Sequence, residues 1–291
     1  MPELPEVEVT RRRIEPLLVG RRIAEVRTSK PSYFFLTPPA RLRAGLLGRS
    51  VRALERRGKY LLAELDDAKR LVLHLGMTGQ LFSSAATSPR LLSSARRVAL
   101  APEEQPSFVP DEHTHLELCF ADGEPTVRFR DVRKFGKVLL LDAGVSDKRL
   151  ERLGRDALGA SADDLHGAAR GRRVAVKSLL LDQSVLAGVG NIYADEALFL
   201  AGVRPTRRAG RVSLRECEAI MTGLRGVLER SIETGGSSIS DYVAPDGQDG
   251  GYQDERRVYG RKGEPCPRCG SAIARIVIGQ RAAHYCRRCQ K

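Results

Sequence analysis

The chain opens with Met1-Pro2-Glu3-Leu4-Pro5-Glu6, a stretch that predicts the first element of the fold. Pro5 suits the first turn of a helix, where its missing N–H leaves no hydrogen bond unmade. Val7, Ile14 and Leu18 then follow at helical spacing. We therefore expect a helix from Pro5 to Leu18 that buries one apolar face and whose acidic first turn suits the helix dipole.

The same residues support a chemical interpretation. Pro2 is small enough that we expect Met1 to be trimmed after synthesis, which leaves a secondary amine, and nothing at this end resembles a signal peptide or a presequence. An α-amino group titrates near about 7.7–8.0, so part of it is an unprotonated nucleophile at neutral pH. With Glu3 beside it, such an amine is suited to imine chemistry on a sugar or carbonyl carbon. Taken alone, these residues favour the ordinary helix start.

Composition favours a nucleic-acid partner. With 291 residues, 42% of them hydrophobic, the chain is long enough for two domains and a small third module. No apolar run approaches about eighteen residues, so we expect no membrane span. The net charge is +13, and residues 255–291 alone hold ten Lys or Arg and two Glu. Basic charge gathered in one short tail indicates a surface that meets phosphates.

The cysteines predict a metal site. Cys266-x-x-Cys269 and Cys286-x-x-Cys289 are separated by sixteen residues, a spacing typical of a structural zinc ion held by four thiolates. Two disulfides are the alternative, but they require an oxidising compartment. Cys119 and Cys217 stand alone in apolar patterns and are expected to be buried small hydrophobes.

A hairpin is predicted between the two cysteine pairs. Residues 273–278 have a β-branched strand pattern, Gly279-Gln280 is suited to a two-residue turn, and residues 281–285 return as a second strand. The metal would then rigidify a hairpin whose tip displays Arg281.

Short strand patterns dominate roughly the first 140 residues. Candidate strands lie at residues 23–28, 50–54, 59–65, 70–75, 113–120, 126–129 and 137–141. Many strands at short spacing predict an antiparallel sandwich or barrel. Residues 83–110 are rich in Ser, Ala, Pro and Arg without periodicity, and we expect an extended surface loop there.

The second half of the chain is expected to be helical. Helical structure with glycine breaks is predicted over 150–165. Further helices are predicted over 174–183 and 192–200, with the turn Ala187-Gly188-Val189-Gly190-Asn191 between them. Such a turn either brings backbone amides onto a phosphate or is simply a tight helical corner. A longer helix should run from Ser213 to Gly235, and residues 237–253 are typical of a flexible flap.

Six motifs, in order along the chain, resemble those of bacterial formamidopyrimidine-DNA glycosylases. They are Pro2–Glu8, Gly58–Leu62, His74–Gly79, Asp131–Gly136, Gly188–Tyr193, and Tyr259–Cys266 together with Gln280-Arg281 and Cys286-x-x-Cys289. The resemblance covers the whole chain apart mainly from residues 83–110. It implies a multidomain α+β fold: an N-terminal antiparallel β-sandwich flanked by helices, a helix–two-turn–helix domain and a C-terminal zinc-finger β-hairpin.

The resemblance, together with the changes in composition along the chain, predicts four segments. The catalytic sandwich would occupy 1–145 and the helix–two-turn–helix domain 146–236. A flexible lesion-recognition loop would occupy 237–254, and the zinc finger, with one structural Zn²⁺, 255–291. The resemblance also implies a monomeric bacterial enzyme, cytoplasmic and associated with the nucleoid, that acts on damaged double-stranded DNA.

The resemblance assigns chemistry to four residues. Pro2 would attack the anomeric carbon of the sugar and form a Schiff base as the damaged base leaves, and Glu3 would be the acid that helps to open the sugar ring. Lys59 would assist β-elimination, although a phosphate contact is the simpler interpretation. Arg281, at the hairpin tip, would act in δ-elimination.

The resemblance also assigns DNA contacts. Once the damaged nucleotide leaves the stack, the space must be filled. Met77, Arg133 and Phe135 match void-filling residues, with Arg133 pairing with the orphaned cytosine. His113 and Arg172 match positions that contact DNA in the family, although a solvated surface explains both nearly as well. Asn191 and the glycines before it would hold the phosphate that flanks the lesion. His115 shares a strand with His113 and could be confused with it.

Departures from the family pattern are few, and two other functions compete. Val132, Lys134 and Arg172 differ from the residues common at those positions but keep charge or lie between functional residues.

Endonuclease VIII-like enzymes, which prefer oxidised pyrimidines, share Pro2, Glu3, Lys59 and the zinc finger. A non-catalytic zinc-ribbon DNA-binding protein would explain the charge and the zinc, yet it gives no reason for Pro2, Glu3 and Lys59 together.

Overall fold

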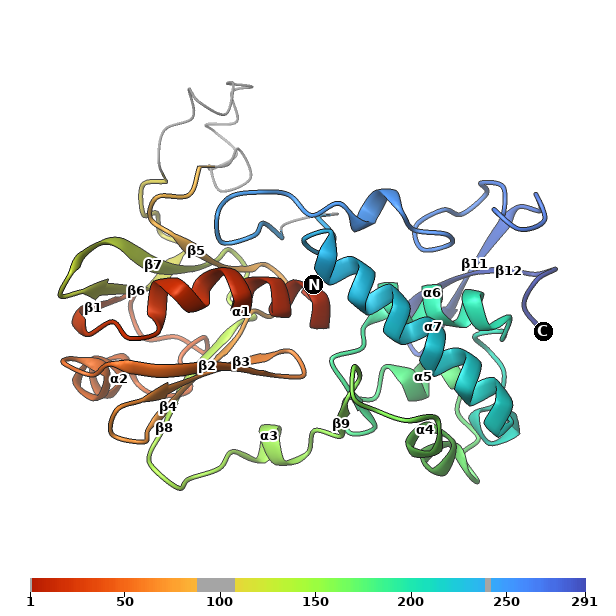
Figure 1. Cartoon of the computed structure of the whole chain (residues 1–291), viewed down its shortest axis with the longest axis horizontal. Helices are drawn as coiled ribbons and strands as arrows, with labels where there is room; N and C mark the ends of the chain where they lie inside the picture. Colours follow the sequence, from red (N-terminus) through yellow and green to blue (C-terminus); the bar gives the residue numbers. More distant parts are fainter. Residues whose placement is uncertain (1, 88–107, 239–241) are drawn as a thin grey trace. The chain divides into compact units, whose positions relative to one another are not determined.

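The computed structural model describes residues 2–87, 108–238 and 242–291 (Figure 1). They form two compact units. Unit 1 comprises Met1–Asp147 and Thr234–Gly251, and unit 2 comprises Lys148–Glu233 and Tyr252–Lys291. Each unit is therefore assembled from two separate segments of the chain.

Unit 1 is an antiparallel β-sandwich, as predicted. One sheet has the strand order β1-β6-β7-β5 and the other β2-β3-β4-β8. The strands are β1 (Ile23–Thr28), β2 (Val51–Arg57), β3 (Tyr60–Leu65), β4 (Arg70–His74), β5 (Gly79–Ser83), β6 (Thr114–Phe120), β7 (Gly123–Asp131) and β8 (Lys137–Leu141). Apolar side chains from both sheets share one core, where the rings of Phe34 and Phe129 meet edge to face.

The two helices of the N-terminal segment of unit 1 contact both sheets. Helix α1 (Leu4–Leu18) packs on strands β2, β3, β5 and β7 (Figure 1). Its buried face includes Val7, Ile14 and Leu18, the stripe that the sequence predicts. Helix α2 (Pro39–Leu46) packs on β1 and β8. The helices therefore cover edges of the sandwich and join its two layers.

Two elements of unit 1 were not predicted from the sequence. Helix α2 has Pro39 at its start and buries Leu42 and Leu46, which are one turn apart, but it is too short for periodicity alone to identify. All five residues of β5 are buried, so the strand lacks the polar–apolar alternation that marks a half-buried strand.

Most of the loop expected over 83–110 lies outside the described residues. Its described ends contribute Ala86 and Phe108 to a small buried cluster with Phe82 and Val243. The expected flap over 237–253 is described except for 239–241, and Tyr242, Val243 and Ala244 are buried within unit 1. Both segments thus add packing to the sandwich where the structure describes them.

Unit 2 combines helices with a C-terminal hairpin. Its helices are α3 (Lys148–Glu151), α4 (Ala162–Ala169), α5 (Val176–Leu180), α6 (Asn191–Ala201) and α7 (Leu214–Glu233), with 3₁₀ turns η3 (Ala209–Arg211) and η4 (Tyr252–Asp254). Strands β9 (Arg155–Asp156) and β10 (Leu186–Ala187) form a short parallel pair, and β11 (Ile273–Ile278) pairs with β12 (Arg281–Cys286). Within the described part of the chain, no helix is both long and apolar enough to span a membrane.

Residues 150–165, predicted to be helical with glycine breaks, are helical only at their two ends, in α3 and α4. At Gly154 a Cβ atom would lie 2.4 Å from the carbonyl oxygen of Val185, so the backbone runs against that segment and pairs as β9. Helix α4 then starts afresh at a capping box formed by Ser161 and Asp164. The predicted helix over 174–183 is likewise reduced to the five residues of α5.

We expect Gly76 to be far less replaceable than a glycine of similar backbone geometry. Gly76 and Gly144 both have positive φ, +66° and +73°, but only at Gly76 would a Cβ meet other atoms, 2.4 Å from the backbone nitrogen of Gly136. Gly144→Ala should cost about 1–2 kcal/mol, the strain of a left-handed residue. Gly76→Ala should cost clearly more in the free energy of unfolding measured with urea, and equal losses would contradict the close approach.

Candidate functional site

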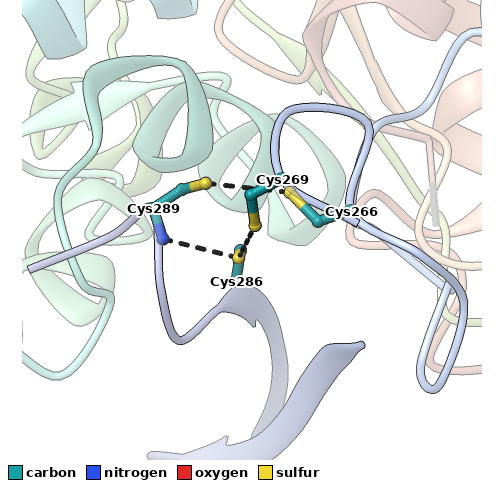
Figure 2. A group of neighbouring side chains, drawn as sticks. All are labelled: Cys266, Cys269, Cys286 and Cys289. Carbon is teal, nitrogen blue, oxygen red and sulfur yellow. Dashed lines mark hydrogen bonds between the residues drawn. The ribbon is translucent and has the colours of Figure 1, made fainter. Parts of the chain in front are cut away.

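The four cysteines of the C-terminal pairs converge on one point (Figure 2). Their sulfur atoms all lie within 4.8 Å of one another, with Cys266 and Cys289 3.9 Å apart and Cys269 and Cys286 3.5 Å apart. Tetrahedral zinc with Zn–S bonds of about 2.3 Å places its ligands about 3.8 Å apart. All four thiols are free, so the donor set and its spacing fit one structural zinc ion and no disulfide.

The hairpin that carries these cysteines is fastened to the helices of unit 2. Lys177 of α5 is fully buried; its Nζ lies 2.6 Å from a carboxylate oxygen of Asp195 on α6 and donates to the carbonyl oxygen of Ala282. The other oxygen of Asp195 accepts from the backbone N–H of His284 at 2.8 Å. Separating the two charges would leave each of them buried without its partner, which is strongly destabilising. The hydrogen bonds of this pair to Ala282 and His284 therefore hold β12 in place.

Arg281 stands where the sequence places it, at the turn between β11 and β12. Gly279 and Gln280 both have positive φ, +52° and +65°, as a two-residue hairpin turn requires. Arg281 faces Ile278 across the ladder, and its side chain is exposed. A cation is therefore displayed at the end of a metal-supported, helix-anchored ribbon.

The N-terminal residues of unit 1 are buried, although chain ends usually fray. Pro2 and Glu3 precede α1, and Glu3 is only 3% exposed. The carboxylate of Glu6 accepts from the backbone N–H of Glu3 at 2.8 Å and from that of Ser237 at 3.0 Å. Glu6, to which the sequence analysis gave no separate role, thus holds the N-terminal backbone against a segment more than two hundred residues away.

Lys59 lies in a turn that is tied to the same helix. Gly58 has a φ of +57°, and its carbonyl oxygen accepts from the guanidinium of Arg56 at 3.0 Å. Arg56 also donates to Glu8 of α1 at 3.0 Å. Burial alone would raise the pKa of Glu8, but its hydrogen bonds with Arg11, Arg12 and Arg56 hold that pKa below the usual range. Lys59 itself is 7% exposed, an unusual burial for lysine.

His74 is a second residue that sequence reasoning passed over. It ends β4 opposite Tyr60, whose ring lies 4.7 Å away, and its Nδ1 accepts from the backbone N–H of Gly76 at 3.1 Å. Burial, together with the charges of Lys59 and Lys137, lowers the pKa of His74 to about 4. The ring is therefore neutral near pH 7 and keeps its proton on Nε2, where it can act as a hydrogen-bond donor. The sequence placed His74 at the start of the His74–Gly79 motif but indicated no role for its side chain.

The expected void-filling residues occupy two neighbouring loops of unit 1. Met77 is half-buried, and Phe135 is 43% exposed, large for a phenylalanine. The Arg133 guanidinium lies over the Phe135 ring, 4.6 Å from its centroid. Gly76 packs directly on the backbone of residues 135 and 136. The structure thus brings together the two loops that carry these side chains.

The two histidines of β6 and the loop before it are clearly separated. The side chain of His113 is 30% exposed, whereas His115 is fully buried. The Nδ1 of His115 pairs with the hydroxyl of Ser29 and its Nε2 with the carbonyl oxygen of Asp131, and burial lowers its pKa. His115 is therefore a packed, neutral residue, and His113 is the one available to a ligand.

The glycine turn of unit 2 is held by Gln183. The side-chain oxygen of Gln183 accepts from the N–H of Gly188 at 2.9 Å, and its amide nitrogen donates to the carbonyl of Val189 at 2.8 Å. Asn191 is the first residue of α6, where the helix dipole favours an anion. Arg172 is exposed, with one nitrogen 3.4 Å from Asp182. The predicted site residues thus form two sets, one on each unit.

Family models match the chain in three consecutive segments. They are described as the formamidopyrimidine-DNA glycosylase N-terminal domain over residues 1–138, the formamidopyrimidine-DNA glycosylase H2TH domain over 153–243, and a zinc finger found in FPG and IleRS over 263–291. The matches follow the order of the sandwich, the helical segment and the cysteine-bearing hairpin.

Individual relatives match over their whole length. The chain is 45% identical to a formamidopyrimidine-DNA glycosylase of Cupriavidus pinatubonensis and 42% identical to one of Halorhodospira halophila, in each case over 100% of both chains. Among solved structures, the MutM (Fpg) protein of Thermus thermophilus is 37% identical, with a TM-score of 0.82 and coverage of 99% and 98%. A Lactococcus lactis Fpg in complex with abasic-site DNA is 32% identical, with a TM-score of 0.83 and 99% of each chain covered.

We expect purified protein to contain one zinc ion per chain. Cys286→Ser should lose most of that zinc and lower the melting temperature, because the ion ties both strands of the hairpin to the preceding turn. Cys217→Ser is the matched control, since Cys217 is equally buried but lies in α7, outside the cluster. Full zinc content in Cys286→Ser, measured by elemental analysis, would contradict the assignment.

The depressed pKa of His74 predicts a pH dependence of stability. Because the pKa is lower in the folded state than its ordinary value of 6.5, the contribution is complete above pH 6.5 and is lost as the pH falls toward about 4. The free energy of unfolding should therefore decline over this interval, and less steeply in His74→Gln. NMR titration of the His74 ring gives the direct check, and a midpoint near 6.5 would refute the burial argument.

Proposed function

The chain belongs to the formamidopyrimidine-DNA glycosylase family of base-excision repair enzymes, and from this premise we propose that it excises oxidised purines, such as 8-oxoguanine and formamidopyrimidines, and then nicks the DNA strand. The observation that carries the proposal is the buried N-terminus, Pro2 and Glu3, held by the carboxylate of Glu6. A module that only binds DNA has no use for such an arrangement.

The first step joins the enzyme to the sugar. After removal of Met1, the secondary amine of Pro2 attacks C1′ of the damaged nucleotide. The base leaves with the electrons of the glycosidic bond and takes up the proton that the amine loses. Glu3 gives a proton to the ring oxygen as the sugar opens, so that C1′ becomes an iminium carbon bonded to Pro2.

Two eliminations then break the strand. Loss of a C2′ proton expels the 3′ phosphate, and a further elimination expels the 5′ phosphate, after which water releases the sugar fragment from Pro2. We assign Lys59 to assistance in the first elimination and Arg281 to the second. In both cases a cation stabilises negative charge that develops on a departing phosphate.

The proposed DNA contacts come from site residues of both units. Met77, Arg133 and Phe135 fill the space left by the flipped nucleotide, with Arg133 pairing with the orphaned cytosine. Backbone contacts come from His113, Arg172 and Asn191. The zinc ion has a structural role, since four cysteines leave no open position for substrate. Its contribution is to keep the hairpin, and hence Arg281, in place.

The finer assignments remain part of this proposal. We place the catalytic sandwich at 1–145, the helix–two-turn–helix domain at 146–236, the lesion-recognition loop at 237–254 and the zinc finger at 255–291. The enzyme would act as a monomer on double-stranded DNA in the bacterial cytoplasm. Support for oxidised purines comes from the Lactococcus lactis relative, whose solved complexes include DNA that contains Fapy-dG.

Two variants test the chemistry. Pro2→Gly and Glu3→Gln should still bind a duplex with 8-oxoguanine opposite cytosine but should lose strand cleavage by about a hundredfold or more, the usual cost of removing a positioned acid or nucleophile. Glu15→Gln is a matched control, because Glu15 lies on the same helix with its side chain 42% exposed. It should cleave like the wild type.

The measurement is single-turnover cleavage on matched duplexes. Undiminished cleavage by Glu3→Gln would exclude the acid assignment. Cleavage of duplexes with oxidised pyrimidines in preference to 8-oxoguanine would move the protein to the endonuclease VIII-like branch. Binding without any cleavage, by protein shown to start at Pro2, would favour the zinc-ribbon alternative.

A further inference from the structure

One buried side chain, Asp131, connects the two loops of unit 1 that carry Met77, Arg133 and Phe135. It is fully buried at the end of β7. One of its carboxylate oxygens accepts from the hydroxyl of Thr78 and from the backbone N–H of Arg133, the latter at 3.2 Å. The other accepts from the backbone N–H of Gly136 at 2.6 Å. A single carboxylate thus binds the residue after Met77 and residues on both sides of Phe135.

The backbone of Asp131 is fixed as well. Its N–H donates to the carbonyl oxygen of His113 at 2.9 Å, and its own carbonyl oxygen faces Nε2 of the buried His115 at 3.0 Å. Because His115 lies in β6 and His113 directly precedes that strand, the backbone of Asp131 is held by groups outside the two loops that its carboxylate binds. It is therefore a fixed point from which the loops are positioned.

The loop from Asp131 to Gly136 contains a residue in a strained backbone conformation. Lys134 has a φ of +56°, a left-handed conformation that costs a non-glycine residue of order 1 kcal/mol and persists only where its surroundings enforce it. The hydroxyl of Tyr33 donates to the carbonyl oxygen of Arg133 at 2.9 Å, which restrains the loop from the other side. Arg133 and Phe135 accordingly project from a rigid backbone.

We propose that Asp131, acting through Thr78, is the positioning residue for recognition of the base opposite the lesion. The inference rests on the proposed function, in which Arg133 pairs with the orphaned cytosine. A pairing side chain discriminates between bases only if its donors are held in register with the base edge. Asp131 keeps Arg133 in that register, and it couples insertion of Met77 to insertion of Phe135 because both loops bind its carboxylate group.

An uncharged isostere cannot replace this carboxylate. Asparagine has one acceptor oxygen and one donor nitrogen, so in either orientation its NH₂ group faces a backbone N–H, that of Arg133 or that of Gly136. Asp131→Asn should therefore release one of the two backbone N–H groups that hold the loop of Arg133 and Phe135. Thr78→Val removes the partner hydroxyl instead and leaves Asp131 in place, whereas Thr78→Ser keeps the hydroxyl and should restore the wild-type behaviour.

The experiment compares binding to duplexes that carry a tetrahydrofuran abasic analogue opposite cytosine or adenine. For the wild type we expect tighter binding opposite cytosine. In Thr78→Val and Asp131→Asn the ratio of the two Kd values should fall about tenfold, toward one, and in Thr78→Ser it should stay near the wild-type ratio. Thr37→Val is the matched control: Thr37 is a buried threonine of the same unit whose hydroxyl bonds Leu140 and neither loop. It should lose stability without losing discrimination.

An unchanged ratio in folded Thr78→Val, or an equal loss of discrimination in Thr37→Val, would overturn the proposal. So would a wild type that binds both duplexes equally. The abasic analogue has no base to excise, so this result does not depend on the chemistry at Pro2. Failure of the glycosylase reaction with preserved discrimination would thus be separate from failure of the positioning role of Asp131.

Discussion

The carboxylate of Glu6 is the interaction on which the proposed chemistry depends most. It accepts from the backbone N–H groups of Glu3 and Ser237, which are separated by most of the chain. Gly236 permits this approach: its φ is +88°, and a Cβ there would lie 3.2 Å from the Glu6 side chain. A terminus that would otherwise fray is thereby buried, and a mobile amine becomes one held in a defined place. In the proposed reaction, folding therefore already supplies most of the entropic cost of positioning the nucleophile before the substrate binds.

Sequence patterns predicted the fold well wherever periodicity and turn chemistry agree. The structure confirms the apolar stripe of α1, the Gly279-Gln280 turn and the convergence of the four cysteines that their spacing predicts. The patterns failed where tertiary packing determines the secondary structure. Strand β5 is buried on both faces and shows no alternation, and residues 150–165, expected to be helical with glycine breaks, are helical only at their two ends because Gly154 lies against Val185.

The candidate site could be predicted only in part. The sequence shows which reactive side chains are present, but it does not show which other residues hold them in position. Pro2, Lys59 and Arg281 are conspicuous by type or by resemblance. Asp131 and Glu6 are ordinary acidic residues until the structure shows which N–H groups they accept. The buried pair of Lys177 and Asp195 joins residues from helices α5 and α6, a contact that no local pattern contains. The residues proposed to act directly were thus easier to identify than the residues that position them.

The central claim is that the amine of Pro2 bonds to the sugar of an oxidised purine nucleotide. Borohydride trapping tests it most directly, since reduction converts the transient imine into a stable adduct. The protein would be incubated with a duplex carrying 8-oxoguanine opposite cytosine, and the adduct located by mass spectrometry of its peptides. The account predicts a covalent adduct on Pro2 of a chain that has lost Met1. An adduct on a lysine instead, or none on protein shown to begin at Pro2 and to bind the duplex, would contradict it.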